Sequence, residues 1–154
     1  MRKYCLSLLL LLLTLVSNAV EPPKREIRGV WLTTVYGLDW PHNPATTETG
    51  QKAQQRDVCD ILDRLQDANF NTVFLQVRMR GDVIWRSAIE PASKTFSGKY
   101  GMMPGYDPLA FVVDECHKRG MECHAWFVTF PLGTDKSVIE QGKLSVVRLS
   151  LIHI

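Results

Sequence analysis

The sequence lacks the features typical of nucleic-acid-binding, zinc-binding and dinucleotide-binding proteins. Eighteen Lys and Arg residues stand against sixteen Asp and Glu residues, and Arg2 and Lys3 account for the excess. The rest of the chain is therefore formally neutral and has no basic stripe for nucleic acid. None of the four cysteines has a Cys-x-x-Cys spacing. No Gly-x-Gly-x-x-Gly turn follows a predicted strand, so a dinucleotide-binding fold is not favoured.

Only one long hydrophobic run occurs, and it lies at the N-terminus. Leu6–Val16 is preceded by Arg2 and Lys3 and followed by Ser17-Asn18-Ala19. This order of basic, apolar and small residues predicts a secretory signal peptide over residues 1–19. The run is shorter than the roughly 20 residues that cross a bilayer, so no stable membrane span is expected. We expect a cleaved signal and a secreted or periplasmic protein. A lipid anchor is less favoured, because Cys5 lies before the run.

Three cysteines remain after the predicted signal: Cys59, Cys116 and Cys123. An odd number argues against a disulfide framework. Cys116 and Cys123 fall on a helix and a strand that follow one another, so they could pair in an oxidising compartment. The interpretation that we favour is that they are small buried apolar residues.

Three strands are predicted from residue type and alternation. Beta-branched and aromatic residues dominate 27–36, which indicates a first strand. Apolar residues recur at every second position over 71–79 and again over 121–130. Residues 20–148 are expected to form the domain, with a proline-containing linker ahead of the first strand.

Two helices are predicted between these strands. Apolar residues recur at helical spacing within 51–69, and Asn69 suits a left-handed C-terminal cap. The second helix begins with Asp107 as N-cap and Pro108 in its first turn, and Gly120 ends it. The connection over 80–106 is much longer than the usual two to six residues, which indicates a binding loop.

Alternating strands and helices imply an α/β fold with a parallel sheet and right-handed crossovers. Both a closed (β/α)8 TIM barrel and an open doubly wound sheet fit this order. The missing glycine motif and the long aromatic connection favour the barrel. A barrel needs about 250 residues, so three strands and two helices correspond to its first part. The chain is therefore predicted to be a truncated barrel.

Polar side chains appear on one face of the second strand toward its C-terminal end. Val73, Leu75, Val77 and Met79 form an apolar face, whereas the other face changes from Phe74 to Gln76 and Arg78. Because α/β proteins bind ligands beyond the C-terminal ends of their strands, we predict that Gln76 and Arg78 contact or orient a substrate. Asp82 follows in the loop, where it either contacts ligand or caps the turn.

On the third strand, His124 and Trp126 are expected to face the same side as Gln76 and Arg78 and to lie with them at the mouth of the site. A histidine there could position a sugar hydroxyl, transfer a proton or bind a metal; a structural histidine is the alternative. Trp40 and Trp126 are candidate platforms for sugar rings, and Trp40, beside Asp39 and Pro41, is expected to be exposed.

Glycoside hydrolysis normally requires two carboxylates. The acids near the expected mouth are Asp39, Asp82, Glu90 and Asp107, and Asp107 is explained by capping. These residues give no convincing acid/base pair, so the catalytic residues are not predicted.

Four segments together resemble the N-terminal part of the glycosyl-hydrolase-family-10-like proteins, a group of bacterial exported and often lipid-anchored proteins. The similarity covers about residues 26–135 and lies in Arg28–Thr33, Asn71–Arg78 with Gly81-Asp82, Pro104–Leu109, and His117–Gly120 through His124-Ala125-Trp126. Many members continue with an Asn-Pro-Tyr-Arg-like run, where this chain has Phe127–Pro131.

The resemblance implies a TIM barrel and hydrolysis of a polysaccharide or cell-wall glycan, with a carbohydrate as partner and no cofactor or metal. It also implies that later strands supply the acid/base pair, so the chain alone is expected to be inactive. A non-catalytic glycan-binding module and a metal-dependent deacetylase or amidase using His124 are the alternatives. Residues 149–154 are unlike the family and are expected to be a non-native tail, so His153 is not a functional candidate.

Overall fold

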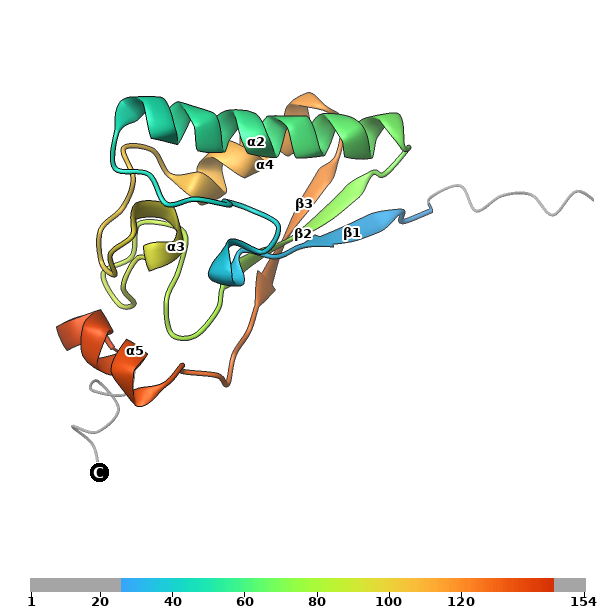
Figure 1. The fold of residues 1–154 in the computed structure, drawn as a ribbon. Coiled ribbons are helices and arrows are strands. Elements are labelled where there is room, and N and C mark those ends of the chain that lie inside the picture. The colour runs from blue at the N-terminus through green and yellow to red at the C-terminus, as the bar shows by residue number, and fades with distance from the viewer. Residues whose placement is uncertain (1–25, 146–154) are drawn as a thin grey trace, which may run out of the picture.

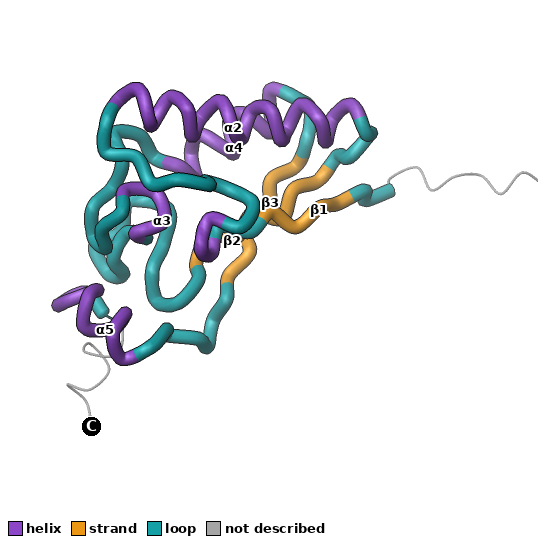
Figure 2. The backbone as a smooth tube through the Cα atoms, viewed as in Figure 1, coloured by secondary structure: helices purple, strands orange, loops and turns teal. Residues whose placement is uncertain are grey.

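The computed structural model describes residues 26–145, which fold as an α/β arrangement of helices on a parallel sheet (Figure 1). The sheet contains β1 (Gly29–Leu32), β2 (Thr72–Arg78) and β3 (Glu122–Phe127) in the order β1-β2-β3 (Figure 2). The predicted signal peptide over residues 1–19 and the predicted tail over residues 149–154 lie outside the described residues.

Two long helices, α2 (Glu48–Asp67) and α4 (Pro108–Lys118), lie side by side on one face of the sheet (Figure 1). Both have N-terminal caps, since Thr47 accepts a hydrogen bond from the Gly50 amide and Asp107 accepts one from the Ala110 amide. Asn69, just after α2, has a φ of 62°, as its sequence position predicted. Local capping therefore sets where the helices that cover the sheet begin and end.

The core lies between these helices and the apolar face of β2. Val73, Leu75 and Val77 are fully buried, and from the helices Val58 and Val112 are also fully buried. Burying a side chain of this size contributes about 1.5–3 kcal/mol. The predicted inward face of the second strand is confirmed, and the polar residues between these positions consequently lie on the other face.

The first and third strands are shorter than the sequence predicted. β1 ends at Leu32, and the chain then turns through the 3-10 helix η1 (Val35–Gly37). The Gln76 side chain accepts hydrogen bonds from the Thr34 and Val35 amides, which replaces the strand ladder there. β3 ends at Phe127 because β2, its neighbour, ends at Arg78.

The long connection after β2 is built into the fold rather than being an open loop. Val83 forms isolated bridges with Arg78 and Ala92, and the short helix α3 (Lys94–Ser97) follows. After β3 the chain forms α5 (Asp135–Gln141) and the 3-10 turn η2 (Gly142–Leu144). Neither short helix was predicted from the sequence. Both lie beyond the C-terminal ends of the strands (Figure 1).

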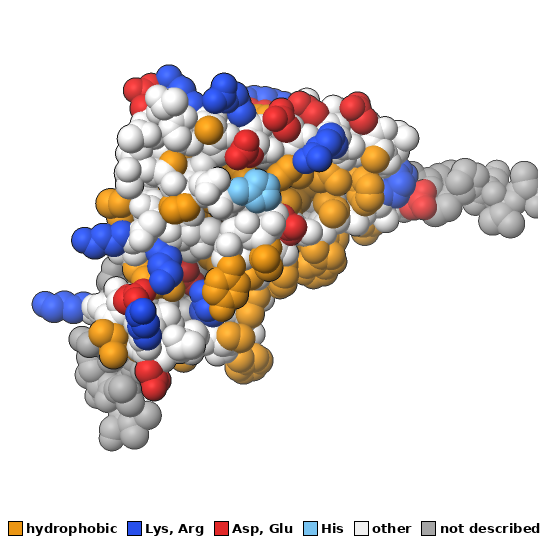
Figure 3. All heavy atoms as spheres, in the orientation of Figure 1, with side chains coloured by type: hydrophobic (Ala, Val, Ile, Leu, Met, Phe, Trp, Pro, Cys, Tyr) orange, Lys and Arg blue, Asp and Glu red, His pale blue; other side chains and the backbone are white. Residues whose placement is uncertain are grey.

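The face of the sheet opposite α2 and α4 carries aromatic side chains with no helix over them. Trp31 stacks on Phe74 with ring centroids 4.8 Å apart and meets Trp126 edge-on at 4.9 Å, while His124 lies 5.4 Å from Phe74. We call these four residues the open aromatic face. Trp31 is 57% exposed, and a hydrophobic patch is visible on the space-filling surface (Figure 3).

No helix within residues 26–145 combines the length and the apolar content that crossing a lipid bilayer requires.

Candidate functional site

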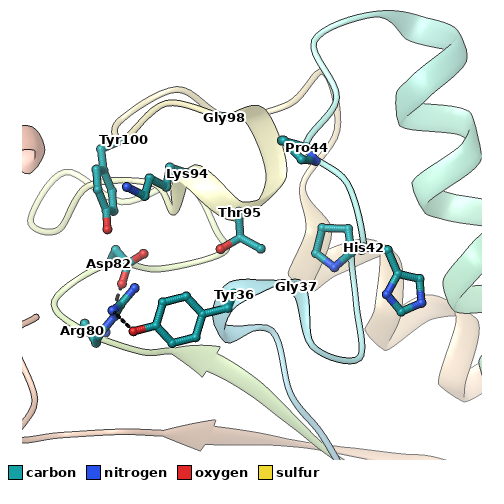
Figure 4. Close-up of a pocket in the computed structure, with 11 residues that line it drawn as sticks. Tyr36, Gly37, His42, Pro44, Arg80, Asp82, Lys94, Thr95, Gly98 and Tyr100 are labelled. Carbon is teal, nitrogen blue, oxygen red and sulfur yellow. Dashed lines mark hydrogen bonds between the residues drawn. The ribbon is translucent and has the colours of Figure 1, made fainter. Parts of the chain in front are cut away.

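A pocket of about 320 Å³ lies beyond the C-terminal ends of β1 and β2 (Figure 4). One wall comes from the segment after β1 and the other from the long connection after β2. Its lining contains aromatic, cationic and acidic side chains together: Tyr36, Gly37, Pro41, His42, Pro44, Arg80, Asp82, Lys94, Thr95, Gly98 and Tyr100. This is the edge of a parallel sheet at which α/β proteins bind ligands.

Asp82 forms part of the pocket through a tight turn. Its carboxylate accepts a hydrogen bond from the Arg80 amide at 3.0 Å, and its own carbonyl accepts one from the Met79 amide at 3.1 Å. Gly81, between them, has a φ of 73°, a conformation that residues with a side chain rarely adopt. Asp82 is therefore held in place locally, and it is buried although it lines the pocket.

Arg80 and Tyr36 meet across the pocket from different loops. The Arg80 Nη1 donates to the Tyr36 hydroxyl at 2.6 Å, and the guanidinium carbon lies 4.4 Å from the centre of the Tyr36 ring (Figure 4). The buried Nε of Arg80 has no hydrogen-bond partner among the described residues. Tyr36 adopts a φ of 57°, which brings its ring to this position. Arg80 therefore keeps one buried donor that no protein group within 26–145 satisfies.

Lys94 and Tyr100 come from the part of the connection that contains α3. The Lys94 ammonium lies 2.8 Å from Glu140 of α5 and 4.9 Å from the centre of the Tyr100 ring. The hydrogen bond to Glu140 raises the pKa of Lys94, so the amine stays protonated. Burial, assisted by the nearby Asp82 carboxylate, raises the pKa of the Tyr100 phenol. Both groups therefore act as hydrogen-bond donors at neutral pH.

Arg78 lies at the C-terminal end of β2, on the face away from the helices, but its donors are occupied. Its Nε and Nη2 bind the Glu90 carboxylate at 2.6–2.9 Å. Its Nη1 donates to the carbonyls of Val128 and Thr129 at 2.7 and 3.1 Å. The hydrogen bonds to Glu90 raise the pKa of Arg78. In this structure Arg78 joins the connection after β2 to the segment after β3.

Gln76 is also occupied by the protein. It is buried, and its Oε1 accepts from the amides of Thr34 and Val35 at 3.0 and 2.8 Å. The Thr34 hydroxyl in turn donates to the Gln76 backbone carbonyl at 2.8 Å. Gln76 therefore fixes the turn that places Tyr36 in the pocket wall. Its role in this structure is to position the pocket rather than to line it.

His124 and Trp126 share the face of Gln76 and Arg78, as their alternation predicted, but His124 does not reach the mouth. It pairs in register with Phe74, whereas Trp126 pairs with Gln76. Arg78 lies four residues beyond Phe74, which is about 13 Å along a strand. His124 is exposed, and its Nε2 lies 2.9 Å from the Glu122 carboxylate. The expected meeting of Arg78 with His124 at one mouth is therefore not present.

The expectation that Trp40 is exposed is wrong. Trp40 is 0% exposed, its indole Nε1 donates to the Gln54 carbonyl at 2.7 Å, and its ring packs edge-on against Phe96 at 4.9 Å. The neighbouring Asp39 and Pro41 suggested a polar loop, but this loop folds back against α2 and α3. In this structure both faces of the ring are covered, so no sugar ring can stack on it.

Of the residues that line the pocket, only Asp82 was predicted from the sequence as a site residue. The others include four with aromatic or cationic side chains: Tyr36, Arg80, Lys94 and Tyr100. Arg80 could have been found, because it directly precedes Gly81-Asp82 in the turn after the strand. The other three depend on how distant loops fold together. Within residues 26–145, no three His, Cys, Asp or Glu side chains gather as potential metal ligands.

Comparison with protein families gives a match over nearly all the described residues. The model of the family described as Glycosyl hydrolase-like 10 matches residues 26–146. This range includes the three strands and both walls of the pocket.

Curated relatives are longer than this chain. The Glycosyl hydrolase DigH of Escherichia coli (strain K12) is 49% identical over 111 residues, which cover 70% of this chain and 25% of that protein. The Glycosyl hydrolase YngK of Bacillus subtilis (strain 168) is 40% identical over 103 residues, covering 67% of this chain and 20% of that protein. The chain thus spans about a quarter of the length of the curated relatives it matches or less.

Proposed function

Because the chain belongs to the glycosyl hydrolase-like 10 family, we propose that it is part of an exported glycoside hydrolase-like protein that acts on a polysaccharide or cell-wall glycan. The parallel sheet would be the first three strands of a (β/α)8 barrel, since its parallel strands follow one another in sequence order with a helix between each pair. The signal-like N-terminal sequence supports export. The observation that carries the proposal is the pocket beyond the ends of β1 and β2.

The pocket is suited to a sugar unit by its chemistry. The rings of Tyr36 and Tyr100 provide aromatic surface for the apolar face of a sugar. Asp82 provides an acceptor for sugar hydroxyls, and the guanidinium of Arg80 provides donors at the pocket wall.

Hydrolysis would require a second free carboxylate near the pocket. Asp82 is the acid in the pocket lining, whereas Glu90 is bound by Arg78 and Glu140 by Lys94. We therefore expect the acid/base pair to need residues outside 26–145, and we expect the chain alone to bind glycans without cleaving them.

Titration of the purified chain with a panel of glycan oligosaccharides tests the proposal, with binding followed by calorimetry and cleavage by product chromatography. We expect binding without turnover. Asp82→Asn should weaken the affinity about ten- to a hundredfold, because a hydrogen bond to a charged group is worth about 1.5–3 kcal/mol. Asp60→Asn, on the exposed surface of α2, is the control.

Equal affinities of the Asp82→Asn and Asp60→Asn proteins would exclude the pocket as the sugar site. Failure of every glycan to bind would contradict the proposal as a whole. A non-catalytic glycan-binding module is the second candidate, and the single free carboxylate of the pocket favours it. Absence of turnover in a longer relative that keeps the same pocket would support this second function.

A further inference from the structure

Cys116 and Cys123 meet between α4 and β3. Cys116 lies in the last turn of α4 and is 0% exposed. Cys123 pairs in register with Val73, whose side chain faces the helices, and it packs against the same core cluster as Cys116. The Met121 amide donates to the Cys116 carbonyl at 3.0 Å, so the chain turns back at once and the strand starts beside the end of the helix.

Both cysteines pack into the same core cluster at the junction of α4 and β3, and each affects the pKa of the other. Hydrogen bonding between them is the largest influence on both groups: it raises the pKa of Cys116 and lowers that of Cys123. Burial adds to the increase at Cys116, and the nearby His124 contributes to the decrease at Cys123. The thiolate, which is the reactive form of cysteine, is therefore favoured at Cys123.

The thiol that is favoured as thiolate is also the one that can be reached. Cys123 is half-buried and lines an open surface groove with His117, Gly120, Met121, Glu122 and His124. Cys116 lies behind it, covered by the core. An accessible cysteine next to a buried one in the same core cluster is the arrangement of an attacking and a resolving thiol.

We propose that Cys116 and Cys123 are an oxidisable pair that closes to a disulfide, with Cys123 attacking an external disulfide and Cys116 resolving the mixed disulfide. The Cys123 thiolate attacks one sulfur of the external disulfide, whose other sulfur leaves as a thiolate and takes up a proton. Cys116 then loses its proton and attacks the Cys123 sulfur, which releases the second external thiol. Two protein thiols are oxidised and one external disulfide is reduced to two thiols.

The third described cysteine, Cys59, is half-buried like Cys123 and serves as an internal control, because its pKa is shifted in the opposite direction and by different neighbours. The Cys59 thiol lies 3.6 Å from a carboxylate oxygen of Glu115, and burial together with this negative charge raises its pKa. Neither Cys116 nor Cys123 contributes to that increase. The inference goes beyond the proposed glycan site and does not depend on it.

Oxidised glutathione is added to the purified full chain under native conditions, the remaining thiols are alkylated, and tryptic peptides are analysed by mass. Trypsin cuts after Lys118 and Arg119, so the two cysteines fall on separate peptides. We expect these peptides to be recovered linked by a disulfide, with Cys59 alkylated. The Cys59→Ser protein should form the same link.

Cys116→Ser should instead keep one glutathione, located on Cys123, because the resolving thiol is gone. The same oxidation in denaturant, where all cysteines are equally accessible, should also attach glutathione to Cys59. Complete alkylation of both Cys116 and Cys123 after native oxidation would overturn the proposal. Glutathione found mainly on Cys59 in the Cys116→Ser protein would overturn the assignment of the attacking thiol.

Discussion

At the scale of single residues, Arg78 holds three parts of the chain together. It belongs to β2, its carboxylate partner Glu90 comes from the connection after β2, and its carbonyl partners follow β3. The Arg78 and Glu90 side chains are each 13% exposed, so this ion pair is shielded from solvent far more than an ordinary surface pair. The planar guanidinium donates to the carboxylate from one edge and to the two carbonyls from another. The compact ammonium of a lysine does not offer this fixed geometry.

Arg78→Ala should lower the free energy of unfolding by about 2–3 kcal/mol, because the carboxylate and two carbonyls lose a charged donor. Urea denaturation measures this change. Lys52→Ala, which removes an exposed pair with Glu48 on α2, is the control and should cost about 0.3–0.5 kcal/mol. Arg78→Lys should fall between them. Equal losses for the alanine variants would mean that the Arg78 pair behaves as a surface pair.

At the scale of elements, a network of ion pairs connects the C-terminal end of α4 to α2. Glu115 accepts hydrogen bonds from Lys118 and Arg119, and Arg119 also binds Asp63 of α2 at 2.6 Å. Hydrogen bonds from Lys118 and then Arg119 lower the pKa of Glu115 to about 2. The unfolded chain therefore takes up a proton on this carboxyl at a higher pH than the folded chain does.

Glu115 should stabilise the fold fully above a pH of about 4.5, and this contribution should disappear as the pH falls toward about 2. Glu115→Gln should remove that part of the pH dependence and make the stability flatter across this range. Urea midpoints measured between these pH values test it, with Glu48→Gln in the exposed α2 pair as control. An unchanged slope in Glu115→Gln would contradict the expectation.

Signals confined to a few neighbouring residues predicted the elements well. Asp107 with Pro108 fixed the start of α4, Asn69 marked the end of α2, and alternation assigned the buried face of β2. These signals suffice because capping and strand parity depend only on nearby backbone. The prediction of strand ends failed where a side chain distant in sequence replaces the backbone hydrogen bonds. The Gln76 side chain, for example, accepts from the amides that would otherwise have lengthened β1.

The candidate site was predicted less fully than the elements. Asp82 was identified because it follows a strand directly, and it does line the pocket. Trp40 was misjudged, since its neighbours are polar but its ring is covered by α2 and α3. Tyr36, Lys94 and Tyr100 reach the pocket only through contacts between loops far apart in sequence, and no local pattern encodes such contacts.

At the scale of the whole molecule, the two faces of the sheet differ. One face is covered by α2 and α4, while the other exposes the open aromatic face, in which Trp31 is 57% exposed. Proteins seldom leave such a large apolar surface in water unless something binds there. The curated relatives are several times longer than this chain, so they have further polypeptide that could cover this face.

The purified chain should bind a hydrophobic dye such as ANS at the open aromatic face. A Trp31→Ser variant should lose much of the dye fluorescence, because an exposed aromatic ring of this surface is gone. Ile89→Ser removes an apolar side chain that is equally exposed but lies on the connection after β2, and it should leave the fluorescence unchanged. Equal signals from all three proteins would place the dye elsewhere.

The contacts that hold the walls of the pocket together all join residues between Tyr36 and Gln141. Tyr36, Arg80, Lys94 and Glu140 bind one another or their immediate neighbours, and the most C-terminal of these contacts, from Gln141 to the Arg80 carbonyl, lies at residue 141. In a longer relative with the same contacts, this binding surface would need nothing from the polypeptide that follows. It could assemble during translation, before most of the polypeptide that follows has been synthesised.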